Sequence, residues 1–368
     1  MLAERPAEPD PARPVCAVVV NWNGWRETVD CLRSLLAVRG NPLRVVVCDN
    51  GSSDDSAAQL ARWLEDLWRG AGTRPANAAL QAWCFEPCAG GAGFVRSVDL
   101  LCLGENLGYA GGLNAGIRWG TERFGAGSFW LLNNDVRVEP QALAALVAAK
   151  DAVPDAGLCG SVLLEWEPPH EVQAIGGIYR KALGVGWHLR QTAAGDAAKK
   201  VCLDIDYPVG ASLFVEQDYL DRVGPMDDSY FLYYEEMDWV ERGRRAGLRP
   251  VVALGSRVFH KEGASTGSHG GVRRKSLLSE RYGVVNRLRI TRKFWPVLVP
   301  LVWLSLWLVV LDRMLHCEIA RAGLVVRLMF SPAQWLRAPQ ATARRLERAQ
   351  SGPGWARSRM SSARNVRK

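Results

Sequence analysis

The stretch from Phe129 to Val136 ends an apolar run at an aspartate. The apolar residues predict a buried central strand that is covered by helices on both faces. Open α/β sheets bind ligands at the carboxyl ends of their strands, so we expect Asp135 to lie in that crevice. A carboxylate there can hold a divalent cation, Mg²⁺ or Mn²⁺, against a diphosphate, because such cations prefer oxygen ligands. The alternative is that Asn133, Asn134 and Asp135 only form a turn.

A group of acids among aromatic residues, between Tyr230 and Trp239, is the second chemical signal. A desolvated carboxylate gains basicity, so Glu235 or Glu236 could remove the proton of an acceptor hydroxyl group. The aromatic side chains could stack on a sugar ring. Asp238 precedes Arg242 by one helical turn, which predicts an ion pair and a structural role for this third acid.

Two polar loops come before these acids. Asp49 ends the β-branched run that starts at Leu43, and such a position contacts a base or ribose in nucleotide-binding sheets. The run from Glu105 to Gly116 is a glycine-rich turn leading into a helix, where backbone can approach phosphates. This turn has neither the Walker nor the dinucleotide-binding spacing of glycines.

The elements that would position these residues alternate between strand and helix. This alternation predicts an α/β fold with a doubly wound, nucleotide-binding sheet. The segment from Gly70 to Val98 has no period, and we interpret it as an insertion. The expected strands are Val15–Val20, Leu43–Cys48, Leu100–Leu103, Val251–Leu254 and Val258–Phe259, and the expected helices are Thr28–Val38, one ending near Leu67, and Pro140–Lys150.

Composition narrows the class of protein. The chain has 368 residues, 48% of them hydrophobic, which is enough for a large core. Its nine cysteines are scattered without a zinc pattern, and they predict buried thiols in a reducing compartment. From Ser331 to Lys368 there are nine Lys or Arg and one Glu, so this tail carries the whole formal net charge of +8. The folded body is therefore not expected to bind nucleic acid.

An uncharged run from Phe294 to Leu311 is about as long as the shortest membrane span. Basic residues flank it on both sides, which opposes a single crossing. The residues from Leu311 to Phe330 are amphipathic, and the Arg-rich tail can face anionic lipid. These features predict a monotopic anchor on the cytoplasmic leaflet, with a buried core helix as the alternative.

Four motifs in this order resemble glycosyltransferase family 2, and most closely its rhamnosyltransferase-like branch. They are Val18–Gly24, Asp49–Ser53, Asn106–Gly112 and Leu132–Asp135, and the resemblance extends to about Arg289. It implies a GT-A fold with a mixed sheet and flanking helices, a nucleoside-diphosphate sugar donor and a divalent metal.

The resemblance also implies roles for residues. Asp135 corresponds to the last acid of the metal-binding motif, whose first acid is replaced here by Asn133, and His260 would complete the metal site. The acid pair falls on Glu235 and Glu236, with Glu236 as the base where the family usually has Asp. Donor-binding residues would be Asn21, Asn23, Asp49, Asn50, Asn106, Gly108, Tyr109, Gly112 and Asn134, and acceptor-side residues Gly210, Ala211, Ser212, Tyr234 and Trp239.

The predicted protein is a metal-dependent, inverting glycosyltransferase on the cytoplasmic face of the bacterial inner membrane, acting in polysaccharide or cell-wall synthesis. Rhamnose from dTDP-rhamnose is the first guess for the sugar, and a lipid-linked saccharide for the acceptor. Predicted segments are a tail (1–14), a GT-A domain (15–272) with nucleotide (15–136) and acceptor (137–272) halves, membrane-associating helices (273–330) and a basic tail (331–368).

Two alternatives remain at this stage. A sugar nucleotidyltransferase would need a basic phosphate-activating loop near the N-terminus, and Asn21 to Gly24 contains none. A catalytically inactive membrane module that binds carbohydrate or a partner would explain the departures from the family pattern at Asn133 and Glu236.

The Gly-rich stretch from Lys261 to Gly271 suits a loop that closes over the donor.

Overall fold

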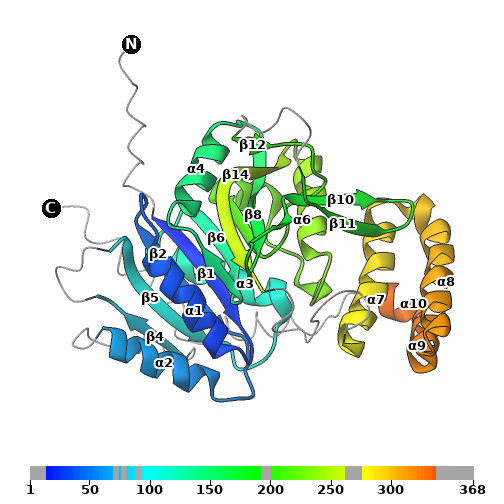
Figure 1. Ribbon diagram of the computed structural model, residues 1–368, viewed down its shortest axis with the longest axis horizontal. Helices are drawn as coiled ribbons and strands as arrows, with labels where there is room; N and C mark the ends of the chain where they lie inside the picture. The colour runs from blue at the N-terminus through cyan, green and yellow to red at the C-terminus, as the bar shows by residue number, and fades with distance from the viewer. Residues whose placement is uncertain are drawn as a thin grey trace, which may run out of the picture.

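The computed structural model describes residues 14–68, 74–75, 81–87, 93–191, 200–261 and 276–336. A large mixed sheet crosses the protein in the order β12-β14-β8-β13-β6-β1-β2-β5-β4-β3 (Figure 1). Its strands are β1 (Val15–Asn21), β2 (Leu43–Asp49), β3 (Arg74–Pro75), β4 (Gln81–Phe85), β5 (Val95–Cys102), β6 (Ser128–Asn133), β8 (Ala156–Glu165), β12 (Val201–Cys202), β13 (Ser212–Glu216) and β14 (Arg249–His260).

Four strands of the nucleotide half are parallel, whereas β4 pairs antiparallel with β5 and β3 antiparallel with β4. β6, β1, β2 and β5 lie side by side in one direction, so their carboxyl ends meet along one edge. Asn21 and Asp49 are paired in register at that edge. The expected α/β fold is confirmed, and the predicted polar strand ends are neighbours as the parallel arrangement requires.

The other half of the sheet is antiparallel around β6. β13 pairs antiparallel with both β6 and β8, so β6 is central but has a parallel neighbour on one side only. The short strand β7 (Val136–Val138) pairs antiparallel with the end of β14. The two late strands expected between Val251 and Phe259 are one strand, with an irregularity between Ala253 and Arg257.

Helices cover both faces of the sheet. One face is covered by α1, α2 and α4, and the other by α3, α5, α6 and part of α7, in two separate apolar cores. The helices are α1 (Trp25–Leu36), α2 (Ser56–Leu67), α3 (Gly108–Phe124), α4 (Ala142–Asp151), α5 (Gln217–Val223), α6 (Glu235–Arg245), α7 (Leu277–Phe294), α8 (Val299–Leu315), α9 (Ile319–Met329) and α10 (Pro332–Leu336).

The glycines of α3 allow this helix to approach the sheet closely. A methyl group on Gly112 would lie 3.0 Å from Val20 Cγ1, and one on Gly116 would collide with Val18. Gly112 and Gly116 are four residues apart and therefore lie on the same face of the helix. Gly112 was predicted to contact the donor. In the structure, the absence of a side chain at Gly112 lets α3 pack closely against β1, so packing explains the glycine at this position.

Three helices form a separate bundle at the C-terminal end of the described chain, next to the hairpin of β10 (Gly176–Arg180) and β11 (Val185–Leu189) (Figure 1). α8 packs on α7 and α9 through an apolar cluster that includes Val302 and Leu306. The segment Pro296–Leu315 is long and apolar enough to cross a membrane. Of the 18-residue window in it that meets this test, 22% is buried in the protein.

Two further expectations concern the segment from Gly70 to Val98 and the loop that was expected to close over the donor. Part of the segment from Gly70 to Val98, which we interpreted as an insertion, forms β3, β4 and the start of β5, with β3 at the edge of the sheet. The short antiparallel strand β9 (Val172–Ala174) lies beside β8. The loop expected to close over the donor lies outside the described residues, except for Lys261.

Candidate active site

Asp135 and His260 are brought together by the pairing of β7 with β14. Asp135 lies in the turn between β6 and β7, and His260 is opposite Val136 in the register of the two strands. The His260 Nε2 atom is 3.5 Å from Asp135 Oδ1, and both side chains are almost fully buried. Asn133 lies beside them, with its Nδ2 atom 3.5 Å from His260 Nε2.

Gln173 determines which nitrogen of His260 carries the proton. The Gln173 amide nitrogen faces two acceptors, Glu165 Oε2 at 3.3 Å and the His260 carbonyl at 3.4 Å. Its oxygen therefore accepts from His260 Nδ1 at 2.8 Å. The lone pair of Nε2 then points toward the Asp135 carboxylate, which is the arrangement of a metal-ligating histidine with a fixed tautomer.

This donor set fits a divalent cation. Asp135 Oδ1 and His260 Nε2 are both acceptors, and they lie 3.5 Å apart. A divalent cation between them would make this close approach favourable, and both residue types bind Mn²⁺ or Mg²⁺. Within the described residues, no point gathers three or more His, Cys, Asp or Glu side chains. Asp135 and His260 are thus the pair through which the protein would hold a metal.

Asn21 and Asp49 form a buried polar pair at the end of β1 and β2. Asn21 Nδ2 donates to Asp49 Oδ1 at 2.7 Å, and Ser52 Oγ donates to the same oxygen at 2.6 Å. The Asp49 carboxylate is 4% exposed, so its present contacts shape the loop that follows β2. Its position at the carboxyl edge of the sheet remains the one expected for a donor-binding residue.

Asn23 and Asn134 stabilise the turn after β1. Asn23 Oδ1 accepts from the Ser53 amide at 2.8 Å, which joins this turn to the loop after β2. Asn134 Nδ2 donates to the Gly24 carbonyl at 3.1 Å and lies 3.2 Å from Thr28 Oγ1. Both residues lie at the predicted site, and their amides shape the backbone there.

Asn50 and Asn106 fix the glycine turn at the start of α3. Asn50 Oδ1 accepts from the Leu107 amide at 3.0 Å, and its Nδ2 donates to Asn106 Oδ1 at 3.1 Å. Asn106 Oδ1 also accepts from the Gly108 amide at 2.9 Å. Gly108 has a φ of +75°, and a methyl group there would lie 2.6 Å from the Phe231 carbonyl oxygen. A side chain at this position would therefore be strained and obstructed.

Tyr109 connects the nucleotide half to the acceptor half. Its amide donates to the Phe231 carbonyl at 2.9 Å, and its hydroxyl donates to the Gly210 carbonyl at 2.6 Å. A methyl group on Gly210 would lie 3.8 Å from both Tyr109 Cε1 and the carboxyl carbon of Glu236. Residues from three distant parts of the sequence therefore meet at one point.

Charges surround Tyr109 on two sides. Burial raises the pKa of Tyr109, and the negative charges of Glu235, Glu236 and Asp135 raise it further. The tyrosine is thus within electrostatic range of both the acid pair and the Asp135–His260 pair.

The acid pair lies at the first turn of α6. Burial raises the pKa of Glu236 to about 7, and burial together with the Glu236 charge raises the pKa of Glu235. Glu235 is 4% exposed, whereas Glu236 is half-buried and next to Gly210. A carboxyl group with a pKa near 7 is well suited to accept a proton near neutral pH.

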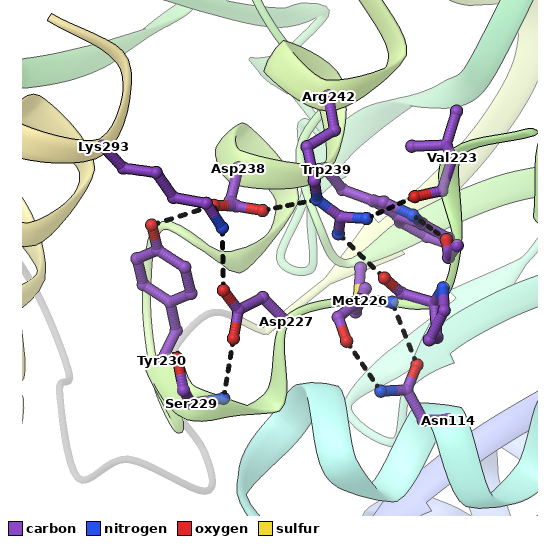
Figure 2. A network of polar contacts seen from close by, with 12 residues as sticks. Asn114, Val223, Met226, Asp227, Ser229, Tyr230, Asp238, Trp239, Arg242 and Lys293 are labelled. Atoms are coloured by element: carbon purple, nitrogen blue, oxygen red, sulfur yellow. Dashed lines mark hydrogen bonds and ion pairs between the residues drawn. The ribbon is translucent and has the colours of Figure 1, made fainter. Parts of the chain in front are cut away.

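Asp238 has a structural role. Figure 2 shows its carboxylate between Tyr230, Arg242 and Lys293. Arg242 Nε donates to Asp238 Oδ1 at 2.7 Å, so the ion pair predicted from the spacing is confirmed. Arg242 also donates to the Val223 and Pro225 carbonyls, which fixes the loop after α5. These contacts exclude Asp238 from the acceptor.

Two of the predicted acceptor-side residues are buried in the core. Trp239 is fully buried against Tyr219, with its indole nitrogen 2.9 Å from the Gly224 carbonyl, so the expectation that it stacks on a sugar is wrong. Ser212 begins β13 and contacts Ser161 Oγ at 2.7 Å inside the sheet. It is fully buried, so it too is separated from any acceptor.

The remaining acceptor-side residues lie closer to the site. Gly210 and Ala211 form a turn that leads into β13, and Ala211 is buried. Tyr234 directly precedes the acid pair, and its hydroxyl donates to the Gly184 carbonyl at the tip of the β10–β11 hairpin. Gly210 is thus the acceptor-side residue that directly adjoins Glu236.

Gln173 and Asn286 belong to the site but were not predicted. Asn286, in α7, donates to three carbonyls of the segment that precedes the acid pair. Gln173 stands in β9, a strand of three residues. Neither position carries a motif, and only a histidine awaiting an orienting partner could have suggested a residue such as Gln173.

No protein-family model matches the chain, but it is similar in sequence to several known proteins. N-acetylglucosaminyl-diphospho-decaprenol L-rhamnosyltransferase of Mycobacterium tuberculosis is 26% identical over 254 residues, which cover 64% of this chain and 72% of that protein. The dTDP-rhamnosyl transferase RfbF of Shigella flexneri is 26% identical over 207 residues, which cover 54% of this chain and 64% of that protein.

A solved structure supports the fold. The crystal structure of GalNAc-T7 with UDP, GalNAc and Mn²⁺ aligns with a TM-score of 0.55 at 13% identity. The alignment covers 78% of this chain and 49% of that chain, so the shared part is about half of GalNAc-T7. These likenesses favour sugar transfer over the nucleotidyltransferase alternative. Its fold and its sequence relatives make this chain a glycosyltransferase of the GT-A fold, with rhamnosyltransferases among its homologues.

Proposed function

We propose that this protein transfers rhamnose from dTDP-rhamnose, with inversion, to a saccharide carried on a lipid diphosphate. The observation that carries the proposal is the meeting of Tyr109, Gly210 and Glu236, which places a candidate base between the nucleotide and acceptor halves. The names of two relatives support the sugar and, in one case, a decaprenyl-diphosphate-linked acceptor.

Glu236 is the proposed base. The acceptor hydroxyl gives its proton to the Glu236 carboxylate while its oxygen forms a bond to the anomeric carbon of the donor sugar. The bond from that carbon to the diphosphate breaks on the opposite face, and the diphosphate leaves with the electron pair. The buried surroundings that raise the pKa of Glu236 to about 7 make it basic enough for this step.

Asp135 and His260 are the proposed metal ligands. A divalent cation bound there would supply positive charge against the departing diphosphate. Gln173 would keep the His260 Nε2 lone pair directed at that position through its 2.8 Å contact with Nδ1. Asn21, Asp49 and Asn50 lie at the strand ends where the nucleoside is proposed to bind.

We place the protein on the cytoplasmic face of the bacterial inner membrane. One side of α8 packs in the bundle, while the other side exposes large apolar residues, with Leu308 66% and Leu315 72% exposed. α9, which packs along α8, has eleven residues and is about 16 Å long, too short to cross a bilayer. This geometry favours α8 lying in the interface with its exposed side in the lipid.

The test is transfer by the purified full chain. The protein is incubated with dTDP-rhamnose, Mn²⁺ or Mg²⁺ and a polyprenyl-diphosphate N-acetylglucosamine acceptor, and the product is identified by mass and anomeric configuration. A panel of other nucleotide sugars, an acceptor without lipid and the Glu236→Gln variant are the controls. Transfer from a different nucleotide sugar would change the proposed donor. Absence of both transfer and donor hydrolysis with every nucleotide sugar would leave the inactive-module alternative.

A further inference from the structure

One face of α7 contacts the segment that leads to the acid pair. Tyr282, Asn286, Arg289 and Lys293 recur at helical spacing and therefore lie on one face. The Tyr282 ring stacks on Phe231 with centroids 4.9 Å apart. Arg289 donates to the Ser229 carbonyl, and Lys293 pairs with Asp227 at 2.8 Å.

Asn286 makes the central contact of this face. Its Nδ2 lies 2.8 Å from the Tyr230 carbonyl, 2.8 Å from the Leu232 carbonyl and 3.1 Å from the Tyr233 carbonyl, so its two N–H groups are shared among three acceptors. We call residues Tyr230–Tyr234 the acid-pair loop, because α6 begins with Glu235 immediately after it. A single buried amide thus satisfies three carbonyls of this loop.

The acid-pair loop has an unfavourable backbone. Phe231, Tyr233 and Tyr234 have φ values of +63°, +67° and +73°, in a region that residues with bulky side chains rarely adopt. Such a backbone conformation is strained and persists only when its surroundings hold it. The three hydrogen bonds from Asn286 are contacts that oppose relaxation of this loop.

The other atoms of Asn286 show that its amide hydrogens are what the position requires. Asn286 is fully buried, and among the described residues its Oδ1 atom has no hydrogen-bond partner. A buried acceptor without a partner is unfavourable, because it has lost its hydrogen bonds to water. An apolar residue of the same size would avoid this cost, so the contacts to the loop carbonyls are the compensating gain.

The opposite side of α7 packs against the apolar helices. Val284 and Leu288 belong to the cluster that α7 forms with α8 and α9. Glu280 pairs with Arg313 of α8 at 2.7 Å and with Arg321 of α9 at 2.6 Å. α7 therefore stands between the exposed apolar helices and the acid-pair loop and contacts both.

We propose that Asn286 is a positioning residue for the sugar transfer, holding the acid-pair loop in the strained conformation that presents Glu235 and Glu236 beside Gly210. The inference rests on the proposed function of the acid pair. Its physical content is that loss of the Asn286 donors lets the loop relax and moves the carboxyl groups away from the acceptor turn.

The experiment compares Asn286→Leu with Val284→Ala in the full chain. Asn286→Leu keeps the number and branching of the side-chain heavy atoms and removes the donors, whereas Val284→Ala weakens the opposite side of the same helix. Hydrogen exchange followed by mass spectrometry reports on peptides that span residues 228–238. We expect faster exchange there in Asn286→Leu only, with a kcat reduced about 10- to 100-fold and an unchanged KM for the donor.

The results that would contradict the role of Asn286 differ from those that would contradict the proposed function. A wild-type kcat in Asn286→Leu, or exchange in the loop no faster than in Val284→Ala, would overturn the positioning role. If Asn286→Leu does not fold, Tyr282→Leu removes the stacking on Phe231 and should produce the same pattern to a smaller extent, and its absence would count against the proposal. If the wild-type chain transfers no sugar, the proposed function fails, while the exchange data still decide whether Asn286 holds the loop.

Discussion

The hydroxyl group of Tyr109 lies 2.6 Å from the carbonyl oxygen of Gly210, 101 residues later in the chain. The contact joins the start of α3, on the nucleotide side, to the turn before β13, on the acceptor side. Because Glu236 adjoins the same glycine, the position of the acceptor turn relative to the base depends on this hydrogen bond.

Tyr109→Phe should therefore reduce transfer more than it reduces stability. Removing one buried hydroxyl costs about 1 kcal/mol of the free energy of unfolding, and we expect kcat to fall about tenfold because the turn loses its anchor. Tyr219→Phe is the matched control, since it removes a 2.6 Å hydroxyl–carbonyl bond to Trp239 away from the site. Equal kcat values in the two variants would contradict the prediction.

Glu236→Gln should abolish most of the transfer while leaving donor affinity intact. The amide keeps the shape of the side chain and removes its basicity, so we expect a loss of about 10²- to 10⁴-fold in kcat. Isothermal titration with the donor nucleotide provides the measurement of affinity. Glu235→Gln should have a smaller effect. The reverse ranking would assign the base to Glu235.

The pH dependence follows from the raised pKa of Glu236. The deprotonated carboxylate is the active base, so kcat should fall as the pH drops below about 7. The stability effect has the opposite direction. A carboxyl group whose pKa rises from 4.5 to about 7 on folding contributes stability below pH 4.5, and this is lost as the pH rises through 7. Thermal unfolding of Glu236→Gln should therefore show a weaker decline over this range than the wild type.

Gln173→Ala should weaken metal binding without touching a metal ligand. Loss of the contact that orients His260 typically costs 10- to 100-fold in metal affinity. The measurement is stabilisation of the protein by Mn²⁺ plus nucleotide in thermal unfolding. Asp135→Asn should abolish this stabilisation while the protein remains folded, and His260→Ala should reduce it. Activity of Asp135→Asn in the presence of a chelator would refute the metal site.

Membrane binding should depend on the exposed side of α8. Leu304 and Leu308 are 57% and 66% exposed, so Asp at either position should release the full chain from anionic liposomes in a sedimentation assay. Leu203→Asp is the control, because Leu203 is 43% exposed and lies outside the bundle. Salt should release part of the bound wild-type protein, since it screens charge attraction. Wild-type protein that stays in the supernatant would refute the anchor.

The alternation of strands and helices in the nucleotide half and the polar strand ends could be predicted from the sequence because they follow simple patterns, whereas β8 and β13 were not predicted. The apolar run before Asp135 and the β-branched run before Asp49 both end at the predicted edge of the sheet. The acid pair was also found from its aromatic surroundings. These signals are local, so they survive without knowledge of tertiary contacts.

The residues that sequence reasoning misjudged are those whose role depends on distant contacts. Trp239 has the right type for a sugar-binding wall, but the face of α6 on which it lies turns into the core. Gly112 follows a glycine-rich turn of the kind that binds phosphate, but a side chain at this position would contact Val20 of β1. Asn286 appears within a basic helix, and nothing in that helix shows that three carbonyls more than fifty residues earlier need its amide.

The dependence of the acid-pair loop on α7 has a consequence for the order of events on the ribosome. The sheet, the glycine turn and both glutamates are synthesised before Asn286, at about 5–20 residues per second. Until Asn286 leaves the exit tunnel, the loop at Tyr230–Tyr234 lacks the amide that holds its strained backbone. The geometry proposed for the acid pair is therefore completed only as the chain begins to produce α8 and α9, so the proposed site and the proposed membrane anchor would become available at the same stage of synthesis.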